Sequence, residues 1–140
     1  MHENFYHNVK VYYEDTDAGG IVYYSNYLKY LERARTEALT TIGLSNLQIK
    51  EKFGALIIVK SCNIEYKKSA YLEDQLSVRS FVKSVTKTSF FMNQYITKDK
   101  ISIVEAQVHL VFVNDKGKPV KIPDIIFENF KPYYCDSIKL

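Results

Sequence analysis

The chain has 140 residues, of which 46% are hydrophobic and 25% are charged, and its formal net charge is +3 at pH 7. This length predicts one domain spanning residues 1–140. The small, scattered positive charge does not favour nucleic acid as a partner. No apolar run approaches the roughly 18 residues that span a membrane, and no leader-like segment follows Met1, so we expect a cytoplasmic protein.

The first predicted elements are a strand, a turn and one long helix. Residues 8–13 alternate with the two-residue period of a strand and lead into a turn at 14–20. Apolar side chains then recur every three or four residues over 26–42, which predicts a helix. The face that we expect this helix to bury comprises Tyr27, Leu28, Leu31, Ala34, Ala38, Leu39 and Ile42.

Residues near both ends of this helix favour its boundaries. Ser25 or Asn26 can cap the start, and Gly43 stands where a left-handed residue ends many helices. Arg33 and Glu37 have the i, i+4 spacing that predicts an ion pair on the exposed face.

β-branched and aromatic residues dominate the rest of the chain, after a short predicted helix at 45–53. Only a few residues separate successive strands, so we expect neighbours in sequence to pair as antiparallel hairpins. A turn at 114–119 and a short helix at 123–130 complete the chain. The strands are predicted at 55–66, 75–85, 89–97 and 101–113.

This order predicts an α+β fold in which one five-stranded antiparallel sheet wraps around the long helix. Such a sheet covers only part of the helix, and many aromatic side chains of the strands remain unassigned. A second copy of the chain would provide cover, so we expect a homo-oligomer, either a dimer or a tetramer.

The segment between the first strand and the helix carries two aspartates, Asp15 and Asp17. Unpaired N–H groups at a helix start favour an anion, and a carboxylate beside them provides a base or nucleophile for acyl transfer. Gly19 and Gly20 would allow a substrate to approach the backbone. The alternative is that both aspartates only tighten a turn. A calcium loop is excluded because Asn26 stands where its bidentate glutamate belongs.

Other catalytic patterns are weaker. The chain has no G-x-S-x-G, and we expect His109 at the surface or an interface and His2 and His7 in a frayed terminus. Cys62 and Cys135 form no C-x-x-C pair. The sequence therefore predicts no metal site and no cofactor.

The segment 12–24, Tyr-Tyr-Glu-Asp-Thr-Asp-Ala-Gly-Gly-Ile-Val-Tyr-Tyr, and the segment 32–37, Glu-Arg-Ala-Arg-Thr-Glu, resemble the signature of the hotdog acyl-CoA thioesterases of the 4-hydroxybenzoyl-CoA thioesterase type. The chain is especially similar to the bacterial branch associated with the Tol-Pal envelope system. The order of elements matches the family over about 6–130, which leaves 131–140 as a tail. The resemblance implies a hotdog fold that hydrolyses acyl-CoA to a free acid and CoA.

The same resemblance implies roles for two residues. The essential carboxylate of the family falls on Asp17, and the backbone N–H that polarises the thioester carbonyl falls on Tyr24. The Tol-Pal branch commonly has a histidine where this chain has Tyr24, whose phenol cannot replace imidazole as a base at neutral pH. The residues leave open whether Asp17 attacks the carbonyl or deprotonates a water.

We expect Gly19, Gly20, Tyr23 and Tyr27 to contact the substrate, with Tyr30 helping to shape the acyl pocket. Lys83 and Lys87, which lie on and after the strand at 75–85, suit the phosphates of CoA.

The branch suggests short aliphatic acyl groups. Two alternatives remain from the sequence: a thioesterase acting on acyl carrier protein, and a non-catalytic module that binds acyl carriers or envelope proteins. The histidine and carboxylate pair of hotdog dehydratases is not evident.

Overall fold

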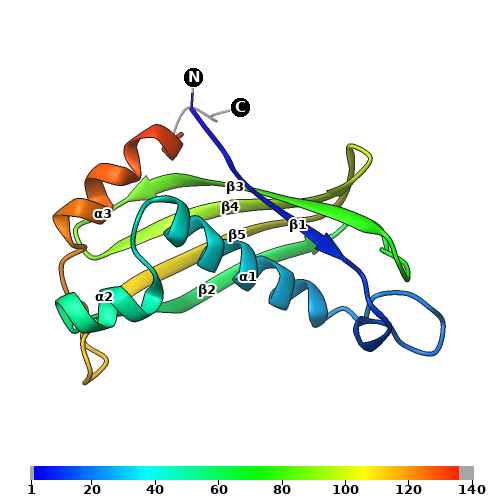
Figure 1. Cartoon of the computed structure of the whole chain (residues 1–140), viewed down its shortest axis with the longest axis horizontal. Coiled ribbons are helices and arrows are strands. Elements are labelled where there is room, and N and C mark those ends of the chain that lie inside the picture. Colours follow the sequence, from blue (N-terminus) through cyan, green and yellow to red (C-terminus); the bar gives the residue numbers. More distant parts are fainter. Residues whose placement is uncertain (1, 136–140) are drawn as a thin grey trace.

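The computed structural model describes residues 2–135, in which five strands form one antiparallel sheet around a central helix. The predicted α+β fold is therefore confirmed. The sheet curves around one side of the helix, and the smaller helices gather at one end of the molecule (Figure 1). The strands are β1 (Phe5–Lys10), β2 (Leu56–Tyr66), β3 (Gln75–Val85), β4 (Ser89–Lys98) and β5 (Ile101–Val113).

The strand order across the sheet is β1-β3-β4-β5-β2. Hairpins join β3 to β4 and β4 to β5 as predicted, but β2 pairs with β5 and not with β3. The expectation of a hairpin between β2 and β3 is wrong because residues 67–74 cross from one edge of the sheet to the other. This crossover packs on the start of the central helix, where the Ala70 N–H donates to the hydroxyl of Tyr27 at 2.9 Å.

The first strand begins and ends earlier than predicted. β1 pairs with β3 from Phe5 to Lys10, and His7 lies opposite Val78 within this pairing. The His2 ring packs on Phe81, with ring centroids 4.9 Å apart. The expectation of a frayed terminus containing both histidines is therefore wrong.

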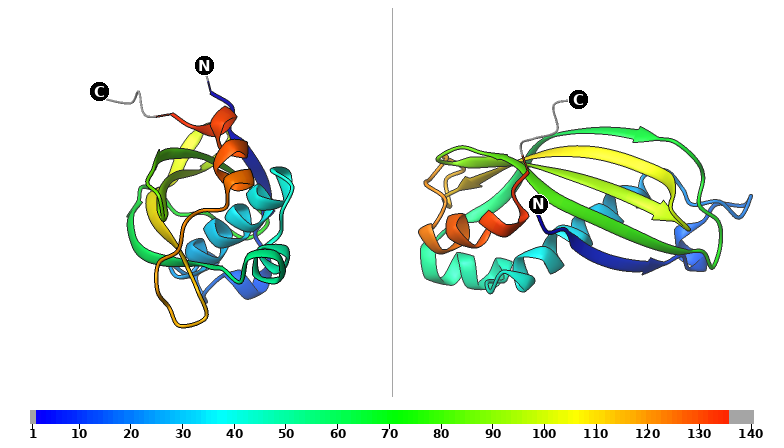
Figure 2. Two further views of the ribbon diagram at one scale, coloured as in Figure 1. Left: turned by 90° about the vertical axis from the view of Figure 1, so that its left-hand side faces the viewer. Right: turned by 90° about the horizontal axis from the view of Figure 1, so that it is seen from above.

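The central helix, α1 (Asn26–Thr41), lies against the concave face of the sheet (Figures 1 and 2). The predicted face is buried except for Leu28, which is 43% exposed, whereas Tyr30 is fully buried. The spacing explains the difference, because Tyr30 and Leu31 lie three and four residues after Tyr27 and continue its stripe. Leu28 lies about 100° away around the helix.

The ends of α1 only partly follow the predictions. Gly43 has the expected positive φ, +104°, just beyond the helix. The Ser25 side chain makes no capping hydrogen bond. Within residues 2–135, Arg33 and Glu37 form no ion pair, so that prediction is also wrong.

The core has two parts, one along each half of α1. The first includes Val11, Tyr30 and Leu31 and supports the segment between β1 and α1. The second includes Leu39 and Phe112 and lies beneath the short helices. Among residues 2–135, no helix has both the length and the apolar character needed to cross a membrane. The short helices are α2 (Asn46–Phe53) and α3 (Asp124–Asn129). Two 3-10 turns complete the fold: η1 (Tyr13–Asp15), between β1 and α1, and η2 (Lys131–Tyr133), after α3.

Candidate active site

The segment between β1 and α1 turns sharply at η1 instead of continuing as a strand to Tyr13. The Tyr12 N–H donates to Oδ2 of Asp15 at 2.9 Å, and the Asp15 N–H donates back to the Tyr12 carbonyl at 3.0 Å. Asp15 is only 8% exposed. Its carboxylate therefore tightens a turn, which is the alternative role that the sequence left open for Asp15.

Asp17 lies in the next turn and is exposed. Its Oδ1 accepts the Gly19 N–H at 2.8 Å, and its carbonyl accepts the Gly20 N–H at 3.0 Å. Gly20 has a φ of +80°, which favours glycine. Within residues 2–135, no hydrogen bond engages Oδ2 of Asp17. The turn therefore fixes the carboxyl group through one oxygen and leaves the other oxygen available.

Gly19 also allows close approach to the carboxylate. A Cβ atom at this position would lie 3.3 Å from Oδ1 of Asp17, closer than ordinary van der Waals contact. The absence of a side chain therefore preserves both the turn and access to it.

The start of α1 provides an unpaired backbone donor. The Tyr23 N–H donates to the Asp15 carbonyl at 3.0 Å, and the Asn26 N–H donates to the Tyr23 carbonyl at 2.9 Å. Between these two, the N–H of Tyr24 has no acceptor among the described residues. This N–H is the one to which the family resemblance assigns the thioester carbonyl.

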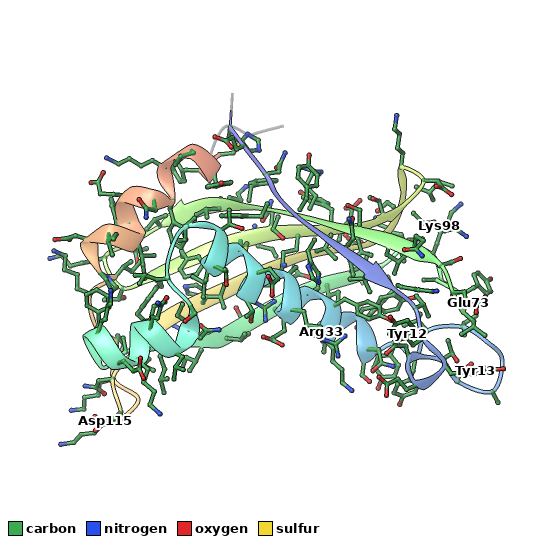
Figure 3. The ribbon with its side chains drawn as sticks, viewed as in Figure 1. Tyr12, Tyr13, Arg33, Glu73, Lys98 and Asp115 are labelled. Carbon is green, nitrogen blue, oxygen red and sulfur yellow. The ribbon has the colours of Figure 1, made fainter. Side chains whose placement is uncertain are left out.

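Asp17 and Tyr24 line the same open cavity of about 380 Å³. Tyr23 and Tyr27 also line it, as predicted, and Tyr66 of β2 forms part of the wall. The end of the molecule that holds this cavity is marked in Figure 3 by Tyr12, Tyr13 and Glu73, opposite the end marked by Asp115. Tyr30 does not line the cavity, contrary to expectation, because its side chain is completely buried.

The tyrosines of the cavity form an aromatic wall. The Tyr66 ring meets Tyr24 edge to face at a centroid distance of 6.2 Å and lies 5.8 Å from the Tyr27 ring. Burial raises the pKa of both Tyr27 and Tyr66 above the usual value for tyrosine. Both phenols therefore stay protonated near neutral pH.

Residues 11–130 match the family model described as the Thioesterase-like superfamily. The chain belongs to this family. It is 38% identical over 116 residues to the acyl-CoA thioesterase YbgC of Haemophilus influenzae, covering 82% of this chain and 85% of the relative. It is also 38% identical over 125 residues to the acyl-CoA thioester hydrolase YbgC of Escherichia coli O6:H1, covering 88% of this chain and 92% of the relative.

Solved structures agree with this membership in the thioesterase-like superfamily. A probable thioesterase from Bartonella henselae superposes with a TM-score of 0.84 at 28% identity, covering 86% of this chain and all of that one. A mutant 4-hydroxybenzoyl-CoA thioesterase complexed with 4-hydroxybenzoyl-CoA gives 0.85 at 20% identity, covering 91% and 98%, and supports the fold alone. The predicted hotdog fold and the predicted enzyme class, a thioesterase, are confirmed.

Two cations of this thioesterase cavity were missed by the sequence prediction. Lys67 and Lys68 line it, and both backbone N–H groups donate to the carbonyl of Ile103. Lys67 also forms an ion pair with Glu65 at 3.6 Å. The available signal was the Lys-Lys pair directly after the strand predicted at 55–66. These two lysines share a cavity with Asp17 because residues 67–74 cross the sheet, and the sequence did not predict this crossover.

Lys83 and Lys87 do not lie at this cavity. β3 begins near the cavity, where Gln75 pairs with Lys10, and Lys83 is close to its other end. The carbonyl of Lys87 accepts the Ile122 N–H at 2.9 Å, next to α3. Neither lysine lines the cavity of Asp17, and their role in binding phosphate stays a prediction.

The described residues offer no cluster of three or more His, Cys, Asp and Glu side chains that could hold a metal ion. His109 stacks on Phe91 with ring centroids 4.0 Å apart, away from the cavity.

Proposed function

We propose that this thioesterase hydrolyses acyl-CoA to a free acid and CoA, with Asp17 as the catalytic carboxylate. One observation carries the proposal: Asp17, which has an available carboxylate oxygen, and Tyr24, which has an unpaired N–H, line the same cavity. The names of the two relatives that are 38% identical, an acyl-CoA thioesterase and an acyl-CoA thioester hydrolase, support the choice of substrate.

The Tyr24 N–H donates to the thioester carbonyl and stabilises the negative charge that develops on its oxygen. In one route, Asp17 removes a proton from water, the hydroxide adds to the carbonyl carbon, and the C–S bond breaks to release the CoA thiolate, which regains a proton. In the other route, Asp17 adds directly to the carbonyl carbon and the C–S bond breaks to release the CoA thiolate, which leaves a mixed anhydride on Asp17. Water then hydrolyses the anhydride to the free acid and the Asp17 carboxylate, and the remaining proton goes to the thiolate. Both routes require the same carboxylate.

Lys67 and Lys68 suit the phosphate groups of CoA, because ammonium groups beside an open cavity attract anions. Their charge also suits the acidic surface or phosphopantetheine of an acyl carrier protein, which is the second candidate donor. Gly19 and Gly20 provide the close approach, and Tyr23 and Tyr27 contribute cavity walls. No cofactor enters either route.

We further propose that the chain forms a homodimer through β2. This strand is one edge of the sheet, and its exposed apolar side chains include Leu56, Ile58 and Val59, which are 42%, 44% and 48% exposed. An edge strand of eleven residues that begins with an apolar stretch is a template for pairing with another strand. Sedimentation should give at least twice the chain mass of 16.3 kDa, and Val59→Lys should give a monomer. A wild-type monomer would contradict the proposal.

A homotetramer would require two such dimers to associate. The link to the Tol-Pal system and a short aliphatic acyl group are proposals that rest on the family branch. The cytoplasm as location also stays a proposal. A single hotdog domain over 1–140 is a further proposal, and residues 1 and 136–140 of that range lie outside the described residues.

The substrate proposal is tested by following loss of thioester absorbance over a panel of short aliphatic, aromatic and long-chain acyl-CoAs, and over the matching acyl carrier proteins. We expect turnover of at least one acyl-CoA, with the fastest rates for short chains. Turnover restricted to acyl carrier proteins would replace CoA as the donor. Hydrolysis of neither class would support the non-catalytic binding module.

A further inference from the structure

A second cavity, of about 140 Å³, lies between the later half of α1 and the sheet, apart from the cavity of Asp17. Most of its walls are apolar. They come from α1, β4 and β5 and include Ala38, Leu39, Phe90, Met92 and Leu110. On one side it is lined by Ile57 and Val59 of the edge strand β2, and Val59 is 48% exposed. The cavity therefore opens toward that edge.

Arg35 lines this cavity and is held rigidly. Its Nη1 donates to Oε1 of Gln94 at 3.0 Å. Gln94 is fully buried, and its Nε2 donates to the Leu31 carbonyl and to Oγ of Ser80, both at 3.1 Å. The amide of Gln94 is thus fixed from both sides, and it fixes the guanidinium beside the apolar walls.

Among the described residues, no carboxylate lies within ion-pair distance of Arg35. Burial lowers the pKa of Arg35, and the nearby charge of Glu32 opposes this change. Glu32 also lines the cavity, but its side chain is exposed and its Oε2 accepts the hydroxyl of Thr36 at 2.6 Å. A partly buried guanidinium with unused donors is costly unless an anion meets it.

We propose that this cavity binds an apolar chain of up to about six carbon atoms that ends in a carboxylate, with the carboxylate on Arg35. The size limit follows from comparison, because an apolar cavity of about 150 Å³ holds a benzene ring. Charge-assisted hydrogen bonds to the fixed guanidinium select the carboxylate, and the apolar walls hold the chain.

Two sources can supply this ligand. One is a free short-chain carboxylic acid. The other is a thioester whose acyl group carries a carboxylate at its far end. This second source rests on the proposed function, because it requires that the protein binds acyl-CoA. Tyr24 and Arg35 are eleven residues apart along the helix, roughly 16 Å, which a six-carbon chain does not span. A thioester would therefore come from the Asp17 cavity of a second copy across β2.

The first experiment compares hexanoate with hexanamide, which has the same chain without the charge, by NMR titration of the full-length protein. We expect hexanoate to bind roughly tenfold to 100-fold more tightly, and decanoate to bind more weakly than hexanoate because it exceeds the cavity. Equal affinity for hexanoate and hexanamide, or binding of neither, would overturn the proposal.

Arg35→Gln removes the charge and keeps an amide that can reach Gln94. It should lower the ratio of the two affinities to about one and leave hexanamide binding unchanged. Arg33→Gln is the matched control, since Arg33 is exposed on the same helix and projects outward from it (Figure 3). If Arg35→Gln does not fold, Ala38→Leu tests the cavity by filling it, and both ligands should lose affinity. Unchanged binding in that variant would overturn the proposal.

Two further experiments distinguish the two ligand sources from each other, and the proposed hydrolysis from binding at this second cavity. Adipyl-CoA and hexanoyl-CoA differ by the terminal carboxylate, so a preference for adipyl-CoA that Arg35→Gln abolishes assigns the thioester source. Equal rates with retained binding of hexanoate assign the free acid. Asp17→Asn should lose hydrolysis and keep hexanoate binding, so that failure of the proposed function and failure of this site are seen separately.

Discussion

The side-chain amide of Asn26 donates a hydrogen bond to the backbone carbonyl of Asp15 at 2.8 Å, and both residues are buried. The same carbonyl accepts the Tyr23 N–H at 3.0 Å. These two bonds tie the segment that carries Asp17 to the start of α1. They therefore hold the carboxylate in a fixed relation to the N–H of Tyr24.

Asn26→Ala should lower kcat more than it changes KM, because the segment loses one of its two ties while the cavity walls remain. Its matched control is Asn129→Ala, which removes an amide that donates to the Ile42 carbonyl at 2.8 Å beyond the other end of α1. Urea unfolding should show that each variant loses about 1 kcal/mol. Equal kcat in the two variants would contradict a positioning role for Asn26.

Tyr30 predicts how stability changes at high pH. Its hydroxyl is buried without a hydrogen-bond partner, and burial followed by nearby Asp15 raises its pKa. Below about pH 10 the phenol is protonated in both the folded and unfolded states. Above that pH the unfolded state releases the proton first, so the free energy of unfolding should fall as pH rises toward the folded-state pKa.

Tyr30→Phe should weaken this dependence, with a remainder due to Tyr27 and Tyr66. It should leave stability at pH 7 unchanged or higher by about 1 kcal/mol, because no unpaired hydroxyl remains buried at this position. Denaturant unfolding between pH 8 and pH 11 provides the measurement. Tyr13→Phe, at a side chain that is 82% exposed, is the control and should retain the wild-type slope. An unchanged slope in Tyr30→Phe would show that this phenol does not cause the effect.

Lys67 and Lys68 should contribute to substrate affinity. The double change of both to Gln is expected to raise KM for an acyl-CoA roughly threefold to tenfold, with kcat nearly unchanged, because exposed charges contribute about 1 kcal/mol or less each. The effect should shrink as salt is added. Steady-state kinetics at two ionic strengths measure both.

The variant for comparison changes both Lys83 and Lys87 to Gln. Within one chain these lysines are remote from Asp17, so a rise in KM there would indicate that a second copy supplies them. A rise limited to Lys83 and Lys87, with none from Lys67 and Lys68, would contradict the assignment of the cavity cations.

The local parts of the fold could be predicted from the sequence. The long helix follows from the spacing of its apolar side chains, and four of the strands follow from their β-branched and aromatic composition. Both are properties of each segment alone. The pairing of β2 with β5 could not be predicted, because the path of 67–74 depends on contacts with α1, such as that between Ala70 and Tyr27. The early end of β1 depends on the Asp15 carboxylate, whose role as a turn-former competes with strand periodicity.

The candidate site was predictable where residues are close in sequence. The turn from Asp17 to Gly20 and the donor at Tyr24 lie within eight residues. Lys67 and Lys68 line the cavity because the crossover brings them there. Tyr30 does not line it, because its position on α1 places its ring in the core. Both differences arise from tertiary packing.

The central claim is that the carboxylate of Asp17 is catalytic. Asp17→Asn is nearly isosteric, keeps an oxygen for the Gly19 N–H, and removes the negative charge. On the best acyl-CoA of the panel, with folding checked by circular dichroism, we expect the rate to fall on the order of 10²-fold to 10⁴-fold. A folded variant that hydrolyses this substrate at the wild-type rate would contradict the account.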